Sequence, residues 1–182
     1  MIRILRLVLV LAFASLSNGC TMNAVKSLPA GDTPLGDRTV VVYGVKVEGD
    51  WKYPKFSVQL AEYDLAKQNI TGNCFQFNRT EAVVASEPGA MKYFAFEVPP
   101  GYYVYSPFHP TRLSGDFLAF EAPAGRSVYI GDFVLEKNQS VSLHRESIKT
   151  DGIDMTWPGL RSQISLASAV AVSRPFVFMC TP

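Results

Sequence analysis

From Arg38 onward the chain alternates apolar and polar residues with a period of two, the pattern of strands that bury one face. The residues that share a face within successive segments are Val41, Tyr43, Val45 and Val47; Phe56, Val58 and Leu60; Phe75 and Phe77; Phe94, Phe96 and Val98; and Leu118 and Phe120. Further extended segments are expected at 102–106, at 128–135, around Val141 and Leu143, and at 175–180. Prolines and glycines at 99–101 and 123–125 mark turns. The pattern therefore predicts about eight or nine short strands.

Strands at this spacing, each with one apolar face to cover, predict an all-β fold, namely an antiparallel β-sandwich of the immunoglobulin or prealbumin-like kind. A closed barrel is the alternative. One segment breaks the period of two and has apolar residues at intervals of three and four, at Leu160, Ile164, Ala167 and Ala171. With Pro158 where a first helical turn tolerates it, this spacing predicts one short C-terminal helix over 159–171. Residues 150–157 are expected to form the loop before that helix.

A glycine interrupts the apolar run between Val128 and Leu135. Strict alternation places Tyr129, Gly131 and Phe133 on one face of this strand and Asp132 on the opposite face. A missing side chain inside a strand permits a bulge or the close approach of another element. We therefore expect a structural role for Gly131, and expect Asp132 to cap a turn or to end the buried part of the strand.

Two stretches resemble a known pattern, residues 98–105 (Val-Pro-Pro-Gly-Tyr-Tyr-Val-Tyr) and residues 123–132 (Pro-Ala-Gly-Arg-Ser-Val-Tyr-Ile-Gly-Asp). They are similar to parts of transthyretin-like or carboxypeptidase-regulatory-like sandwich domains of small bacterial envelope proteins, in which a Pro-Gly turn leads into a Tyr/Val strand. The resemblance covers residues 95–135. It implies a non-catalytic β-sandwich, in a group that includes families of unknown function.

The N-terminal residues carry a second resemblance. Two arginines precede an apolar run at 7–14, and small or polar residues then lead to Cys20, which is the build of a signal peptide. Gly19 and Cys20 resemble the lipobox of bacterial lipoproteins, although the usual leucine lies one position early, at Leu16. The lipobox implies cleavage before Cys20 and acylation of this cysteine, and acyl chains would hold the protein on a membrane.

The residue after the cysteine is Thr21 and not the aspartate that resembles an inner-membrane retention signal. The resemblance thus implies an outer-membrane lipoprotein that faces the periplasm. A plain secretory signal that is cleaved nearby is the alternative. We expect a signal peptide at 1–19, a lipidated flexible tether at 20–37, which is rich in proline and glycine, and the β-sandwich domain at 38–182.

Cys74 and Cys180 are the cysteines that remain after Cys20. The cell envelope permits disulfides, and we predict that these two residues pair. The loop that they would close spans about a hundred residues, a length for which the chain-entropy description gives about 4–5 kcal/mol. Two buried free thiols are the alternative. A metal site is not expected, because no other ligand lies at a suitable spacing.

The charge is balanced, with 17 basic and 16 acidic residues, so the chain has no field that would attract nucleic acid. The common local motifs of serine hydrolases, zinc proteases and nucleotide-binding enzymes are missing from the sequence. His109 would need a nearby acid such as Asp116 to act in catalysis. His144 follows an inward-facing residue and is expected to point to solvent. We expect no cofactor.

Asp151 and Asp154 flank Gly152. Two carboxylates are too few for a calcium ion, which takes six to eight oxygen ligands. An Asp-Gly turn is the better interpretation.

Tyr103 and Tyr105 are the candidate ligand-binding residues, together with His109. If Val104 points into the core, alternation puts both tyrosines on the outer face, with Tyr93 beside them on the preceding strand. Exposed tyrosines suit the binding of sugars, peptides or another protein. Packing of the rings beneath the following loop or against the helix is the alternative.

Taken together, these features predict a lipid-anchored cell-envelope module that binds or assembles with a protein or glycan partner and has no catalytic activity. The alternative is a small periplasmic enzyme that uses His109 with a nearby carboxylate.

Overall fold

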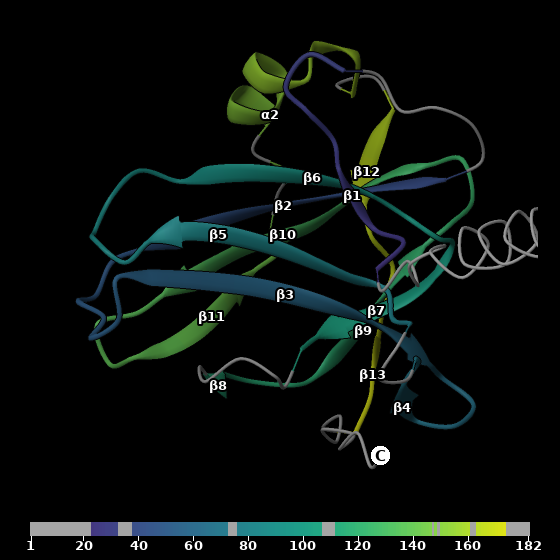
Figure 1. Cartoon of the computed structure of the whole chain (residues 1–182), viewed down its shortest axis with the longest axis horizontal. Helices are drawn as coiled ribbons and strands as arrows, with labels where there is room; N and C mark the ends of the chain where they lie inside the picture. Colours follow the sequence, from purple (N-terminus) through teal and green to yellow (C-terminus); the bar gives the residue numbers. More distant parts are fainter. Residues whose placement is uncertain are drawn as a thin grey trace, which may run out of the picture.

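The structure is a computed structural model that describes residues 23–32, 38–72, 76–106, 112–146, 148, 150–160 and 163–173. Strands make up 54% of it and helices 6%. Two sheets pack together, and one of them is curled (Figure 1). This architecture confirms the predicted all-β sandwich with one short helix.

The first sheet is built around β2 and β10, and its order is β1–β6–β2–β10–β11–β8, with β12 also paired to β10. The bounds are Lys26–Ser27 for β1, Lys92–Val98 for β6, Thr39–Val47 for β2, Ser127–Leu135 for β10, Ser140–His144 for β11, Arg112–Leu113 for β8 and Ile164–Leu166 for β12. We expected antiparallel pairs, but β10 runs parallel to β2 and β12, and β11 runs parallel to β8. A parallel pair needs a long crossover, and the chain between β2 and β10 passes through strands of both sheets.

The second sheet has the order β13–β9–β7–β3–β4, with β5 also paired to β3, and its pairs are antiparallel. The bounds are Ala169–Ala171 for β13, Leu118–Ala122 for β9, Gly101–Tyr105 for β7, Lys55–Asp64 for β3, Asn69–Ile70 for β4 and Arg79–Ala85 for β5. Across both sheets, eight strands in the described part have five or more residues, and five more have only two or three.

The main core lies between the two sheets. Residues that alternation assigned to one face and that are buried together here are Val41, Tyr43, Val45, Val47, Phe56, Val58, Leu60, Phe96, Val98 and Phe120. The hydroxyl of Tyr43 donates to the carbonyl oxygen of Val58 at 3.2 Å and lies 2.8 Å from the hydroxyl of Thr80. The Tyr43 side chain therefore links β2 of the first sheet to β3 and β5 of the second. Burial raises the pKa of Tyr43.

Gly131 forms the bulge that its position in β10 permits, with a φ of 139°. The register between β10 and β2 shifts here, between Tyr129 and Asp132. A bulge changes the face that the following residues occupy. Phe133 therefore joins Ile130 in the main core, and Asp132 shares the face of Tyr129, whose hydroxyl donates to its carboxylate. Our alternation through Gly131 was wrong because it assumed a regular strand, and Asp132 is buried instead of marking the end of the buried segment.

The helix predicted over 159–171 is also wrong. The structure has α2 at Thr150–Thr156, where we expected a loop, then a single 3-10 turn η1 at Pro158–Leu160, and then β12 and β13. The apolar spacing has another cause, because the chain crosses here from the first sheet to the second. Ile164 packs on the outer face of the first sheet, whereas Ala167 faces the main core.

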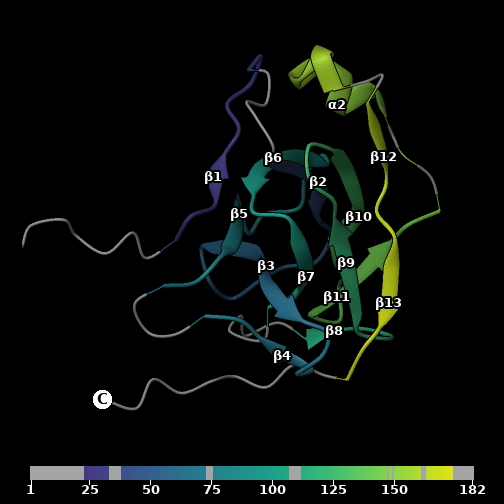
Figure 2. The same ribbon diagram turned by 90° about the vertical axis from the view of Figure 1, so that its right-hand side faces the viewer.

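A second, smaller cluster lies on the outer face of the first sheet, beneath α2 (Figure 2). Its buried members are Leu28, Val40, Val42, Ala95, Tyr129, Ile153, Trp157 and Leu160. The indole N–H of Trp157 donates to the carbonyl oxygen of Pro29 at 2.8 Å. This cluster therefore joins α2, the first sheet and the N-terminal residues into one unit.

Residues 23–28, which we name the N-terminal strap, lie along the seam where β5 of the second sheet meets β6 of the first (Figure 2). The Asn23 side chain donates to the carbonyl oxygen of Arg79 at 2.7 Å and accepts the N–H of the same residue at 3.1 Å. Val25 packs against the main core between these contacts and β1. The strap therefore closes one half of the β5–β6 seam.

This placement differs from the flexible tether expected at 20–37. The described residues 23–32 contact the sandwich along their length. Leu28 is buried, and the N–H of Gly31 donates to the carbonyl oxygen of Thr156 at 2.9 Å. Proline and glycine content indicated a linker, but β1 and its neighbours are held by tertiary contacts that composition does not reveal.

Candidate recognition site at the β5–β6 seam

Several residues predicted to have a role lie outside the described residues, namely Cys20, Cys74, His109 and Cys180. The acylation of Cys20 and the pairing of Cys74 with Cys180 therefore stay predictions. The same holds for any catalytic or ligand-binding role of His109.

Tyr103 and Tyr105 do not form the exposed pair that we predicted. Their side chains are 0% and 3% exposed and belong to the main core. The Tyr103 hydroxyl donates to the carbonyl oxygen of Pro99 at 2.9 Å, and burial raises the pKa of Tyr103. Val104 points the other way, into a third cluster on the outer face of the second sheet. The prediction failed because β7 is apolar on both faces, so alternation does not reveal which face is inside.

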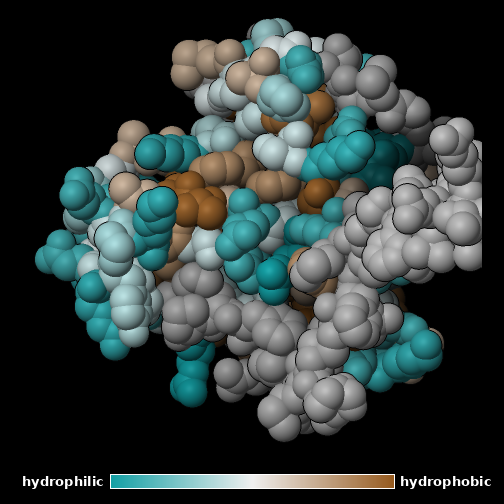
Figure 3. Space-filling view, in the orientation of Figure 1, coloured by the Kyte–Doolittle hydropathy of each residue, from teal (hydrophilic) through white to brown (hydrophobic). Residues whose placement is uncertain are grey.

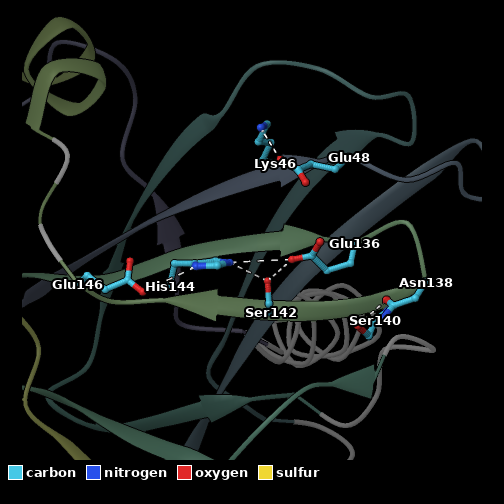
Figure 4. A network of polar contacts seen from close by, with 8 residues as sticks. All are labelled: Lys46, Glu48, Glu136, Asn138, Ser140, Ser142, His144 and Glu146. Carbon is cyan, nitrogen blue, oxygen red and sulfur yellow. Dashed lines mark hydrogen bonds and ion pairs between the residues drawn. The ribbon is translucent and has the colours of Figure 1, made fainter.

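His144 points to solvent, as expected, and belongs to a polar network on the β10–β11 hairpin (Figure 4). Its Nε2 lies 2.9 Å from the Oγ of Ser142, and the Ser142 hydroxyl donates to the Oε1 of Glu136 at 2.5 Å. The Ser142 hydroxyl therefore lies between a carboxylate and an imidazole.

In the described part of the chain, no three histidine, cysteine, aspartate or glutamate side chains are arranged to hold a metal ion. Asp151 and Asp154 lie in α2 and not in the expected turn. None of the described helices combines the length and the apolar character needed to cross a membrane.

One end of the sandwich, which we name the turn end, carries the loops 48–54, 86–91 and 136–139, at the left of Figure 1. Backbone hydrogen bonds join these loops to each other and to β2. The N–H of Ser86 donates to the carbonyl oxygen of Pro54 at 3.3 Å, and that of Gly89 to the carbonyl oxygen of Val47 at 3.1 Å. A Cβ atom at Gly49 would lie 2.5 Å from the carbonyl oxygen of Glu136, so two loops approach closely here. The turn end is therefore a connected surface.

Trp51 and Tyr53 form an aromatic pair in the first of these loops, with ring centroids 5.6 Å apart. Trp51 also contacts Phe56 in the core at a centroid distance of 6.4 Å. Tyr53 is 48% exposed, and the Lys52 Nζ lies 5.0 Å from the centroid of its ring. An aromatic side chain that is held on one side and exposed on the other suits the recognition of a partner.

A hollow opens in the β5–β6 seam at the turn end and has a volume of about 180 Å³. Its apolar lining includes Val45 and Val47 of β2, Val84 of β5 and Pro88 of the loop 86–91. Figure 3 shows hydrophobic side chains gathered between β5 and β6 on this face. An apolar cavity of roughly 150 Å³ accommodates a benzene ring. The hollow is therefore large enough for one apolar side chain of a partner.

The edge of β5 beside this hollow carries backbone groups that point away from the sheet. The carbonyl oxygen of Asn78 and the N–H of Ser86 both bond toward the β3 side. Backbone direction alternates along an antiparallel strand, so Glu81, Val83 and Ala85 direct their N–H and C=O groups outward. Within the described part of the chain, no residue bonds to these outward groups.

Sequence reasoning missed Trp51 and Tyr53, although their context carried a signal. They lie in Gly49-Asp50-Trp51-Lys52-Tyr53-Pro54, where turn-forming and charged residues surround two aromatic ones. Aromatic residues in such a loop have no strand face to cover and are candidates for a surface role. The hollow had no comparable signal, because its walls come from distant parts of the chain.

Comparison with known proteins adds no family assignment, because no family model, curated protein or solved structure matches the chain. The resemblance of residues 95–135 to transthyretin-like domains therefore stays a prediction.

Proposed function

We propose that this protein is a lipid-anchored binding module of the bacterial cell envelope that holds an extended segment of a protein partner. The proposed site is the turn-end half of the β5–β6 seam. The observation that supports it most is an open hollow beside the edge of β5. No described residue hydrogen-bonds to the outward N–H and C=O groups of this edge.

The N-terminal strap already binds to the edge of β5 in the way that we propose for a partner. In its half of the seam, Asn23 satisfies both outward groups of Arg79, and Val25 packs against the main core. A partner segment would do the same in the other half, with main-chain hydrogen bonds to Val83 and Ala85 and one apolar side chain in the hollow. Strand addition of this kind draws its affinity from the backbone and its specificity from pockets.

The valines of the hollow suit an apolar side chain of a protein partner. Val45, Val47 and Val84 line it with methyl groups, and Glu87 and Lys92 also belong to its lining. Tyr53 and Trp51 add rigid contact area at the same end of the sandwich, and an ordered ring loses little conformational entropy on binding. The site thus combines the open edge of β5, the hollow and the aromatic pair Trp51–Tyr53.

The anchor in this proposal is Cys20, acylated after signal-peptide cleavage, in an outer-membrane protein that faces the periplasm. Such a setting permits the predicted Cys74–Cys180 disulfide. The mass of the mature protein, measured before and after reduction and alkylation, tests both modifications.

Photo-crosslinking in intact cells tests the binding site. A photoreactive amino acid at Tyr53 should give a protein adduct of reproducible mass, whereas the same group at Lys67 should not. Lys67 is a suitable control because its side chain is 82% exposed but lies in the β3–β4 turn, away from the seam.

A second substitution separates strand addition from other modes of binding. Val83→Pro removes an outward N–H that plays no part in pairing with β3, so it should abolish the Tyr53 adduct. Val83→Ala should keep the adduct, and both variants should unfold at similar temperatures. An adduct that survives Val83→Pro would contradict strand addition, and an adduct removed by glycan hydrolases would contradict a protein partner.

A further inference from the structure

We propose that the partner segment of the proposed function, on which this inference rests, is held by two of its side chains that lie three residues apart. One side chain enters the hollow, and the other, which is aromatic, enters a cleft between α2 and β6. The lining of this α2–β6 cleft consists of residues 91–94, at the start of β6, and of Gly152, Met155 and Thr156 in α2.

The N-terminal strap shows how one extended segment reaches both faces of the first sheet. Val25 packs against the main core between the sheets, whereas Leu28 is buried in the cluster on the outer face, beneath α2. Between these two residues the strap pairs with β6, at Lys26 and Ser27. Successive side chains of a strand point to opposite faces, so residues three positions apart lie on opposite sides of the edge of β6.

The strap turns away from β6 before the start of that strand. The N–H of Leu28 donates to the carbonyl oxygen of Ala95 at 2.8 Å, and the N–H of Gly31 then donates to the carbonyl oxygen of Thr156 in α2 at 2.9 Å. At the start of β6, Lys92 lines both the hollow and the α2–β6 cleft. β6 contacts β5 on one side and α2 on the other, as Figure 1 shows. A segment in the turn-end half of the seam therefore has one opening on each side of β6.

The α2–β6 cleft suits an aromatic side chain. Its volume is about 400 Å³, against about 180 Å³ for the hollow. Met91 and Met155 bring two thioethers to its lining, and Tyr93 and Phe94 bring two rings. Thioethers adapt their shape and make favourable contacts with aromatic rings. Met155 is 83% exposed, so most of its surface is available to cover an incoming ring.

The packing of α2 on β6 fixes one wall of this cleft. A Cβ atom at Gly152 would clash with Cε2 of Tyr93, so the Tyr93 ring packs directly on the backbone of α2. Glycine is unfavourable inside a helix, and this close contact explains its presence. Gly152, Met155 and Thr156 share one face of α2 because they are three and four residues apart, whereas Ile153 is buried in the cluster below.

Lys92 adds a positive charge between the two openings. It is the one charged side chain in the lining of the α2–β6 cleft, and it forms no ion pair with another described residue. Glu87 lines the hollow but not the cleft. An acidic residue between the two apolar residues of the segment would pair with Lys92. The segment that fits the site thus carries an aliphatic residue, an acidic residue and an aromatic residue in this spacing.

Selection from a phage library of random peptides tests the proposal. The target is the full-length protein as it is processed in cells, held in detergent. Enriched peptides should share an aliphatic and an aromatic residue three positions apart, with aspartate or glutamate between them. Enriched peptides with a single apolar residue, or with two at an even spacing, would overturn the proposal. The absence of any enriched peptide would contradict the proposed function as well.

Variants of Met155 test whether the aromatic residue occupies the α2–β6 cleft. Met155→Glu should weaken binding of the selected peptides roughly tenfold, because it places a charge against the ring, whereas Met155→Leu should keep the affinity. Neither variant should change the unfolding temperature, because the Met155 side chain is exposed. A loss of binding in Val83→Pro without a loss in Met155→Glu would overturn the role of the cleft and leave the proposed function intact. Full binding in both variants would contradict both.

A charge exchange tests the role of Lys92. Lys92→Glu should weaken the selected peptides, and replacing the acidic residue of the peptide with lysine should restore binding to this variant. Lys92→Arg, which keeps the charge, should bind the original peptides as the parent does. Equal binding of the original peptides to Lys92→Glu and to the parent would overturn this pairing.

Discussion

The two halves of the β5–β6 seam differ in what fills them. In the strap half, Val25 packs against the main core, and Asn23 occupies the outward backbone groups of β5. In the turn-end half, the same two strands border a hollow of about 180 Å³, and no described residue bonds to the outward groups of Glu81, Val83 and Ala85.

The difference shows that the two sheets leave this seam open where no further segment covers it. Strands pair when they lie about 4.8 Å apart, but facing sheets pack about 10 Å apart. β5 and β6 belong to different sheets and do not pair, so a third segment has room to lie between them. The chain supplies this segment in one half. We propose that a partner supplies it in the other.

Loss of Arg38 should disrupt the strap half most. Its Nη2 donates to the carbonyl oxygens of Ala24 and Glu97, at 2.7 and 3.0 Å, and so joins the strap to β6. Hydrogen bonds to charged groups contribute about 1.5–3 kcal/mol, so Arg38→Ala should lower the free energy of unfolding by about 2–3 kcal/mol in urea titrations. Arg38→Lys, which keeps the charge, should cost less. An Arg38→Ala variant as stable as the parent would contradict this bridging role.

Matched truncations compare the two halves directly. Val98 lies in the strap half and is 0% exposed, whereas Val84 lines the hollow and is 6% exposed. Val98→Ala leaves a new cavity, so it should cost about 2 kcal/mol, and Val84→Ala only widens an existing opening and should cost about 1 kcal/mol. Thermal or urea unfolding measures both. Equal costs would indicate that the hollow is sealed in solution.

The smallest expected effect comes from Asn23→Asp, which keeps the acceptor for the Arg79 N–H but removes the donor to the Arg79 carbonyl. The loss of one partly buried hydrogen bond should cost about 0.5–1 kcal/mol.

Hydrogen exchange at single amides compares the two halves of the seam. The Arg79 amide should be protected in the parent and in Asn23→Asp, and should exchange faster in Asn23→Ala. The outward Val83 amide should exchange fast in all of them, and a slow Val83 amide would show that its edge is already covered.

Alternation predicted the inner faces of β2, β3, β6 and β9, because the main core demands large apolar residues at every second position there. It failed at β7, where Val104 is buried in the third cluster while Tyr103 and Tyr105 fill the main core. It failed again after Gly131, because a bulge moves all later residues of the strand to the other face. The helix placed over 159–171 failed for a related reason, since the chain changes sheets there.

The sequence by itself determined the class of this protein: an all-β chain of short strands with one dominant core and nearly balanced charge. These properties follow from local periodicity and composition, which act over a few residues. Only the tertiary structure decided where the N-terminal strap, the hollow and the aromatic pair Trp51–Tyr53 lie. Asn23, Val45 and Val84 lie far apart along the chain, and they share one seam because of the order in which the strands pair. That order depends on long-range packing, which no local pattern encodes.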